Sequence, residues 1–189
     1  MGTRKSIHLE VSAYRQKQNN TCVPSCCKMY LDYLDKANMT KVESKLEEET
    51  IAEIMDTGPS GTRWPEIPNI NSAIESNPSL EFIPEYGPHS LSDIKKQLEK
   101  NLPVIVWIAP IDAAYAGLHS ILITGIDDEK KEISYNDPAY GEEKTLSQSE
   151  FMDLWQYEHG ARMIKVEIGE LTTKTQSSLE PFMSKEVSH

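Results

Sequence analysis

The chain has 189 residues and a formal net charge of −11, with 38% hydrophobic and 26% charged residues. This length is enough for one domain with a substantial core. No stretch approaches the roughly 18 apolar residues of a membrane-spanning helix. The acidic excess disfavours nucleic acid as a partner, because phosphate binding requires clustered lysine and arginine.

The amino-terminal sequence MGTRKSIHLEVSAY contains basic residues without an apolar segment behind them. This pattern argues against a secretory signal, so we expect a cytoplasmic protein that does not bind membranes. Three cysteines are an odd number for a disulfide framework, and all of them stand in QNNTCVPSCC (18–27). Cys26 and Cys27 are adjacent, and Cys22 lies one helical turn before Cys26, so no pair would crosslink distant segments. These free thiols indicate a reducing compartment.

The first half of the chain shows mainly helical patterns. Apolar residues recur at helical spacing after Cys22, and Pro24 suits a first helical turn. The motif Ser-Lys-Leu-Glu at 44–47 resembles a capping box. The stretch TGPSGTRWPEIPN, rich in proline and glycine, reads as a loop that holds Trp64 either in the core or against a cleft. We expect helices over 22–38, 44–55, 69–75 and 90–100, a loop over 57–69 and a strand over 80–83.

The second half changes to β-branched apolar runs. PVIVWIAP and HSILITGI read as strands buried on both faces, and the polar stretch DDEKK between the second and the third strand reads as a five-residue hairpin loop. Ser-Gln-Ser-Glu then opens a last helix. The expected strands are 103–110, 119–126, 132–137 and 161–168, and the expected helix is 147–155.

Helices followed by an antiparallel sheet indicate an α+β fold with segregated halves, and a site is expected in the cleft between them. We expect one domain over 1–169 and a polar, flexible tail over 170–189.

Cys22 is the best nucleophile candidate of the three cysteines. At the start of a helix its sulfur meets unpaired backbone N–H groups and the positive end of the helix dipole, which both stabilise a thiolate. Cys26 lies on the side of the helix that continues into apolar residues and is expected to pack in the core, and Cys27 has no special feature. All three can also be read as buried small hydrophobic residues. A zinc site is disfavoured because C-x-x-C spacing is absent, so no metal or cofactor is expected.

His119 is the candidate base because it begins an apolar strand. If Ile126 faces Glu132 across the hairpin, position 119 faces 139, and Asp137 becomes its diagonal neighbour on the same face. A carboxylate placed there can orient an imidazole and fix its tautomer. The alternative is that NDPAYG (136–141) is an ordinary turn and His119 a core residue. The other histidines lie near the termini or in expected loops: His8, His89, His159 and His189.

The chain resembles the papain-like peptidases of the bacteriocin-processing C39 type, and more closely their stand-alone C39-like relatives. The resemblance rests on QKQNNTCVPSCCKMYLDYL (16–34), on the apolar strand in 101–110, on GLHSILITGIDDEKKEISYNDPAYG (117–141), and on the helix in 146–155. It implies a papain-like fold, with the amino-terminal helical half packed against the carboxyl-terminal antiparallel sheet. Both Gln16 and Gln18 could donate to an oxyanion, and the family spacing selects Gln16. Val23 and Ser25 depart from the small residues usual around the proline.

The resulting hypothesis is a cysteine peptidase or related thiol amide hydrolase acting on a peptide or protein substrate. Cys22, His119 and Asp137 would form the triad, and Gln16 would stabilise the oxyanion. A deamidase, transglutaminase or isopeptidase would use the same residues. The alternatives from other classes are a non-catalytic binding module on the same scaffold and, ranked last, a metal or redox sensor. The sequence leaves the specificity and the oligomeric state open.

Overall fold

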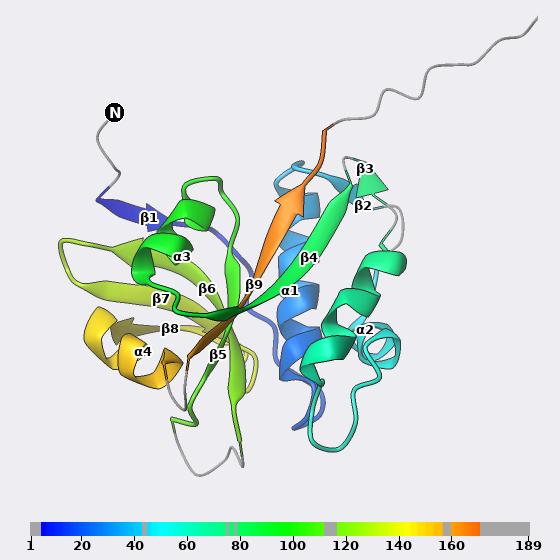
Figure 1. The fold of residues 1–189 in the computed structure, drawn as a ribbon. Coiled ribbons are helices and arrows are strands. Elements are labelled where there is room, and N and C mark those ends of the chain that lie inside the picture. The colour runs from blue at the N-terminus through cyan, green and yellow to red at the C-terminus, as the bar shows by residue number, and fades with distance from the viewer. Residues whose placement is uncertain are drawn as a thin grey trace, which may run out of the picture.

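The structure is a computed structural model and describes residues 5–42, 45–74, 76–77, 79–111, 117–156 and 160–170. None of the helices within these ranges is long and apolar enough to cross a membrane. The elements, labelled in Figure 1, are β1 (Ser6–His8), α1 (Cys22–Lys36), β2 (Lys41–Val42), α2 (Glu48–Ile54), the 3-10 helix η1 (Trp64–Ser72), β3 (Ser76–Asn77), β4 (Leu80–Gly87), α3 (Leu91–Leu98), β5 (Val104–Ile108), β6 (His119–Asp127), β7 (Glu132–Asp137), β8 (Glu142–Ser147), α4 (Gln148–Trp155) and β9 (Ala161–Ile168).

The described strands form a seven-stranded antiparallel sheet and a small two-stranded one. The large sheet has the order β4-β9-β5-β6-β7-β8, and β1 pairs with the last residues of β6, beyond the first residue of β5. The expected α+β architecture is therefore confirmed. The halves are less segregated than expected, because β1 and β4 come from the first half of the chain and still join the sheet.

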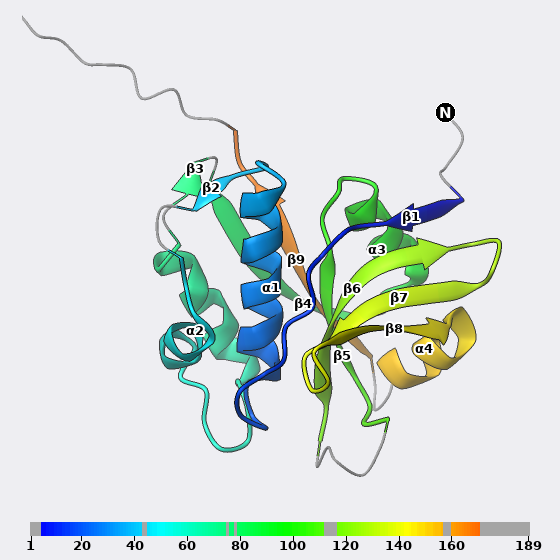
Figure 2. The same ribbon diagram turned by 180° about the vertical axis from the view of Figure 1, so that it is seen from behind.

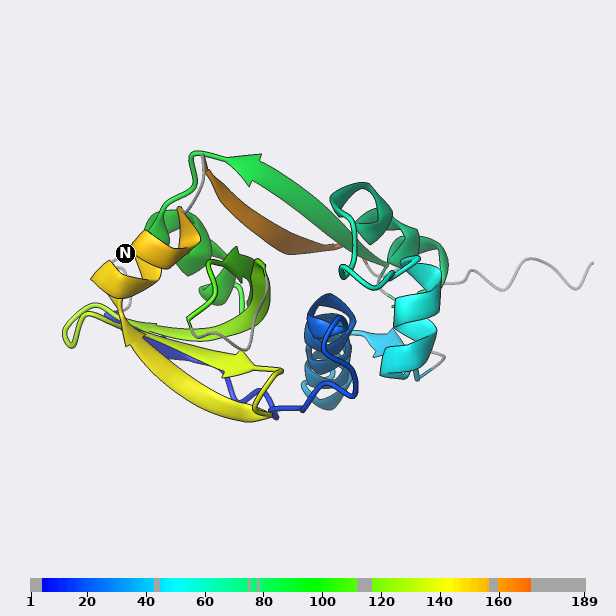
Figure 3. The ribbon, with the colours of Figure 1, turned by 90° about the horizontal axis from the view of Figure 1, so that it is seen from below.

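The sheet bends strongly, and helices cover it on both sides. In Figure 3, α1 lies within the bend while α3 and α4 lie on the opposite side, where α3 packs on β5 and β6 and α4 packs on β5, β7 and β8. Helix α2 and η1 lie beyond α1. The extended segment between β1 and α1 runs along the gap between α1 and the β6–β8 part of the sheet (Figure 2). Helix α1 is almost entirely buried because sheet and chain surround it. Its core side chains include Cys26, Cys27, Met29, Tyr30 and Leu34.

Most predicted elements lie within a few residues of the observed ones. Several expectations were wrong in detail. The helix predicted from 44 begins at Glu48, and Ser44 lies outside the described residues. The loop predicted over 57–69 contains a 3-10 helix from Trp64, which Pro65 can enter in its first turn because proline lacks only an N–H that would be unpaired there. The strand β8 was not predicted, because EEKTLS is polar and largely solvent-facing.

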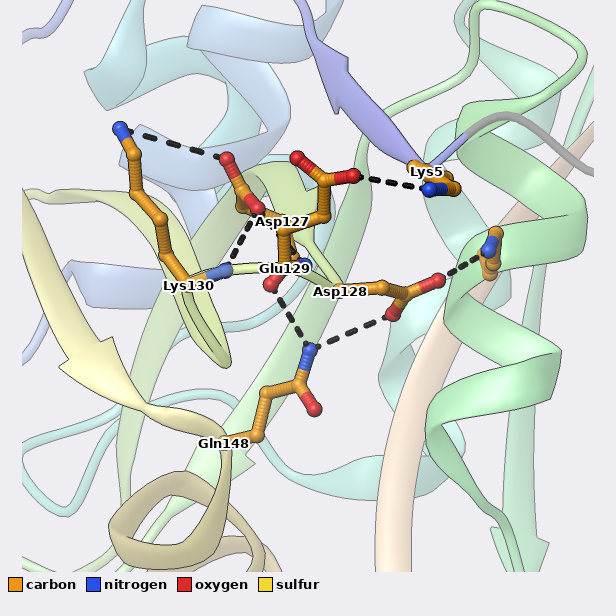
Figure 4. A network of polar contacts seen from close by, with 7 residues as sticks. Lys5, Asp127, Asp128, Glu129, Lys130 and Gln148 are labelled. Carbon is orange, nitrogen blue, oxygen red and sulfur yellow. Dashed lines mark hydrogen bonds and ion pairs between the residues drawn. The ribbon is translucent and has the colours of Figure 1, made fainter.

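The β6–β7 hairpin turn is held by a polar network at the end of the sheet (Figure 4). The Asp127 side chain accepts hydrogen bonds from the backbone N–H groups of Glu129 and Lys130, each at 2.9 Å. Lys5 pairs with Glu129 at 3.0 Å, and the Gln148 amide donates to the Asp127 carbonyl at 3.2 Å. These contacts fix a four-residue loop that ends with a left-handed residue, Lys131 at φ 60°.

This turn gives a register different from the prediction. Asp127 faces Glu132 and Ile126 faces Ile133, so the expected pairing of Ile126 with Glu132 was wrong by one residue. A β-bulge between Ile123 and Gly125 then shifts the pairing, and beyond it Ile123 faces Tyr135. The pairing past the bulge coincides with the prediction, because the extra residue in β6 compensates for the shorter loop.

Candidate active site

Cys22 is the first residue of α1, at the end of the molecule where β5 ends and where β6 and β9 begin (Figure 1). It is partly exposed and lines a cleft. The first turn of the helix contains no acidic residue that would oppose an anion there. Unpaired N–H groups and the helix dipole therefore favour the thiolate form.

His119 and Asp137 form a buried hydrogen-bonded pair. The distance between His119 Nε2 and Asp137 Oδ1 is 2.8 Å, and their side chains are 3% and 2% exposed. His119 is the first residue of β6 and Asp137 the last of β7, so both lie at the same end of the sheet. Because Nε2 faces the carboxylate, the remaining ring nitrogen, Nδ1, is the one available to a thiol.

The environment of Cys22 favours its ionised form. Burial raises the pKa of the thiol, but a hydrogen bond with His119, the charge of that imidazole and the backbone N–H groups of Ser120 and Val23 outweigh burial and lower it. The opposite shift occurs at His119. Burial lowers the pKa of the imidazole, whereas hydrogen bonds to Asp137 and Cys22 and their negative charges raise it to about 9. Both shifts act in the direction of a thiolate–imidazolium pair.

Asp137 stays ionised beside the imidazole. Burial raises its pKa, but the hydrogen bond and charge of His119, the N–H of Ala139 at 3.0 Å and the Lys144 ammonium at 3.5 Å lower it. The Ala139 N–H and His119 both bind Oδ1, so the turn after β7 orients the carboxylate. A thiol, an imidazole and a carboxylate in this order are the groups that nucleophilic acyl transfer uses.

A second buried carboxylate, Glu48 at the start of α2, holds the loop that leads to Cys22. Its Oε1 accepts hydrogen bonds from the Lys17 N–H at 3.0 Å and the Thr21 hydroxyl at 2.5 Å. Thr21 is the N-cap residue of α1, and Glu48 is only 1% exposed. Glu48 therefore fixes the backbone immediately before the candidate nucleophile.

Gln16 lies beside the pair, although it does not line the cleft. Its backbone N–H donates to the Pro138 carbonyl at 2.7 Å, next to Asp137. Its side-chain Nε2 donates to the Gln18 carbonyl at 2.7 Å, which leaves one amide hydrogen for another acceptor. The oxyanion role of Gln16 stays a prediction. Gln18 is exposed and uses its backbone to hold Thr21.

The cleft has a volume of about 1120 Å³, and of its walls the sequence suggested only the loop that holds Trp64. One wall is the turn at 57–62, which the Asn20 amide holds by donating to the Gly58 carbonyl at 2.8 Å. The lining also includes Trp64 and Trp107, whose rings meet edge to face at 5.0 Å. Trp64 is therefore both packed and cleft-lining. Arg162, at the start of β9, also lines the cleft and carried no signal in the sequence.

The other two cysteines are fully buried in the core, as expected for Cys26. Burial raises the pKa of both thiols, which keeps them protonated and unreactive. Cys26 donates to the Ser120 carbonyl at 3.6 Å, linking α1 to β6. Within the described ranges, no group of three His, Cys, Asp or Glu side chains is placed to hold a metal ion. His8 binds Glu143 at 2.7 Å on the surface, and His159 and His189 lie outside the described residues.

Comparison with known proteins gives a family and a fold. The model of the Peptidase_C39 like family matches residues 8–163. The crystal structure of the peptidase domain of Streptococcus ComA, a bi-functional ABC transporter involved in a quorum sensing pathway, matches with a TM-score of 0.58 at 14% sequence identity. The match covers 85% of this chain and 100% of that domain. No curated protein sequence matches the chain.

Proposed function

Because the chain belongs to the Peptidase_C39 like family, we propose that it is a cysteine peptidase or related thiol amide hydrolase. The observation that carries this proposal is the charge arrangement at one end of the sheet. The pKa of Cys22 is lowered while that of His119 is raised to about 9, and a buried carboxylate binds the imidazole at 2.8 Å. A purely structural cysteine has no need of an ionised partner. The three free cysteines also fit a reducing compartment, such as the cytoplasm.

Acylation begins when the Cys22 thiolate attacks the carbonyl carbon of an amide bond. The new S–C bond pushes the π electrons onto the carbonyl oxygen. The imidazolium of His119 then gives its Nδ1 proton to the amide nitrogen, the C–N bond breaks, and the amine leaves. A thioester on Cys22 and a neutral imidazole remain. Asp137 holds the ring in the required tautomer throughout.

Deacylation uses the same groups in reverse. Neutral His119 accepts a proton from water at Nδ1, the hydroxide attacks the thioester, and the thiolate leaves from the tetrahedral intermediate. The oxyanion of both steps lies near the amino terminus of α1, where the Cys22 backbone N–H and the second amide hydrogen of Gln16 are the proposed donors. An acyl acceptor other than water would make the protein a transglutaminase or ligase, and a glutamine substrate would make it a deamidase.

The first experiment measures the pH dependence of iodoacetamide labelling, with each cysteine followed by peptide mass spectrometry. We expect Cys22 to be labelled well below pH 8, whereas Cys26 and Cys27 stay unlabelled in the folded protein because they are buried. Slow labelling of Cys22 with an ordinary thiol profile would favour the non-catalytic binding module.

The second experiment incubates a proteome-derived peptide mixture with wild type, Cys22→Ala and Cys27→Ala. We expect new termini with wild type and Cys27→Ala and none with Cys22→Ala. Cys27→Ala is the matched control, because it removes a thiol from the same helix and leaves the site intact. Equal cleavage by Cys22→Ala would refute the assignment of the nucleophile.

A further inference from the structure

We propose that Arg162 makes the cleft select substrates that carry a carboxylate beside the scissile amide bond. This inference rests on the proposed function, because it names the substrate class of the same cleft. It begins from the charge of the cleft walls, which differs from that of the rest of the chain.

Among the described residues, no acidic side chain lines the cleft of this strongly acidic protein. The chain contains 30 Asp and Glu residues, and none of those in the described ranges lines the cleft. The walls are Asn, Thr, Ser, Gly, Pro, Val, Leu and Trp residues, with the candidate pair of Cys22 and His119 at the base. Apart from that pair, Arg162 is the one charged residue among the described residues that line the cleft. The net charge of the chain is negative, so Arg162 supplies a positive charge in the cleft against an acidic background.

Arg162 has no carboxylate partner among the described residues. Its guanidinium lies over the ring of Tyr86 at 5.1 Å from the centroid, and no Asp or Glu there comes within ion-pair distance. Arg63 differs from Arg162, since its guanidinium binds Asp56 at 3.2 Å and Glu66 at 2.7 Å. Arg162 is partly exposed, and a guanidinium that stacks on an aromatic ring keeps its N–H donors available for a bidentate bond to a carboxylate.

The strand register places Arg162 close to the candidate nucleophile. Arg162 on β9 faces Trp107 on β5, and Trp107 faces Ser120 on β6. Ser120 follows His119 and directs its N–H toward the Cys22 thiol. Two strand spacings separate Arg162 from Ser120, about 10 Å across the sheet. This distance suits a group one to three residues from the scissile bond in an extended peptide.

The carboxylate can have two sources, an Asp or Glu side chain or the free carboxyl terminus of the substrate. Both present the same planar pair of oxygens to the guanidinium. The tryptophan pair beside it supplies an apolar surface for the stem of an acidic side chain or for the residue next to it.

The test of selectivity uses random octapeptides, acetylated and amidated, with one position fixed as Glu, Gln or Lys. We expect wild type to cleave the best Glu set about five- to tenfold faster than the matched Gln set. Arg162→Gln is expected to equalise the two sets, Arg162→Lys to retain part of the preference, and Arg162→Glu to favour Lys. Arg63→Gln is the matched control, because it removes the same charge from an exposed residue outside the cleft. A second arm compares acid-free octapeptides with free and amidated carboxyl termini, and identifies the source of the carboxylate.

An independent readout does not require turnover. At low ionic strength we measure the ratio of the labelling rates of Cys22 with iodoacetate and with iodoacetamide, which differ in charge. Arg162→Gln is expected to lower this ratio about two- to fourfold, while Arg63→Gln leaves it unchanged. The iodoacetamide rate alone should not change, which also shows that the variant has kept its site.

The outcomes separate the two proposals. Cleavage by wild type with the same Glu-to-Gln ratio in Arg162→Gln overturns the role of Arg162 and leaves the hydrolase proposal intact. If no peptide is cleaved, binding of the Glu and Gln octapeptide sets to Cys22→Ser is compared with and without Arg162→Gln. A Glu preference that disappears when Arg162 is replaced supports the role of Arg162 while the hydrolase proposal fails. Equal binding of the Glu and Gln sets to Cys22→Ser overturns the role of Arg162.

Discussion

The substitution Asp137→Asn tests whether the buried carboxylate sustains the thiolate–imidazolium pair. The imidazole pKa rises from 6.5 to about 9, which corresponds to about 3 kcal/mol. Burial lowers the imidazole pKa, so the contributions of Asp137 and Cys22 that raise the pKa are together larger than the net rise. The hydrogen bond to Asp137 is the largest of them. Removing the charge while keeping the shape should therefore lower the imidazole pKa by about 1 to 2 units.

Because the thiol and the imidazole titrate as a coupled pair, a less stable imidazolium also raises the pKa of Cys22. At pH 6.5 the iodoacetamide rate at Cys22 should fall about 10- to 50-fold in Asp137→Asn. Above pH 10 the two rates should converge, since the thiol is then ionised in both proteins. Glu142→Gln is the control, because Glu142 faces Asp137 across β7 and β8 and is exposed. An unchanged pH profile in a folded Asp137→Asn variant would refute this account of the pair.

Three further outcomes are expected. In urea unfolding between pH 4 and 6.5, the free energy of unfolding of Asp137→Asn should be about 2 kcal/mol lower than that of wild type. This difference should shrink as the pH rises through about 9, because the raised imidazole pKa stabilises the fold only while the ring is protonated. Glu48→Gln should lower the free energy of unfolding by about 1–3 kcal/mol and should also lower the labelling rate of Cys22, because two hydrogen bonds to the loop lose their charged acceptor. The control Glu49→Gln, at an exposed residue, should change little. Gly125→Ala should destabilise by about 1–3 kcal/mol in the same assay, because its Cβ would lie 2.8 Å from the Ile7 carbonyl oxygen; an unaltered midpoint would show that β1 moves freely.

The parts of the fold that the sequence predicts well are those with a local signal. Helical periodicity and capping residues locate α1, α3 and α4, and β-branched runs locate β5 and β6. The position of Cys22 at a helix start follows from Pro24 and the apolar spacing behind it. The walls of the cleft have no such signal. Arg162 and Trp107 meet the turn at 57–62 through the bend of the sheet, and a bend depends on how distant strands pair.

The sequence predicted that His119 and Asp137 share a face, and the structure pairs their side chains, but the predicted five-residue loop is in fact a four-residue loop compensated by the β6 bulge. Continued from the turn without the bulge, the register would set Asp137 opposite position 122, and since successive side chains alternate, the carboxylate would point to the face opposite His119. The extra residue, Thr124, restores the common face. Its carbonyl accepts the Leu9 N–H at 2.9 Å, and its hydroxyl donates to Glu143 at 2.9 Å. The segment after β1, more than a hundred residues away in the chain, thus helps to hold the irregularity that aligns the candidate pair.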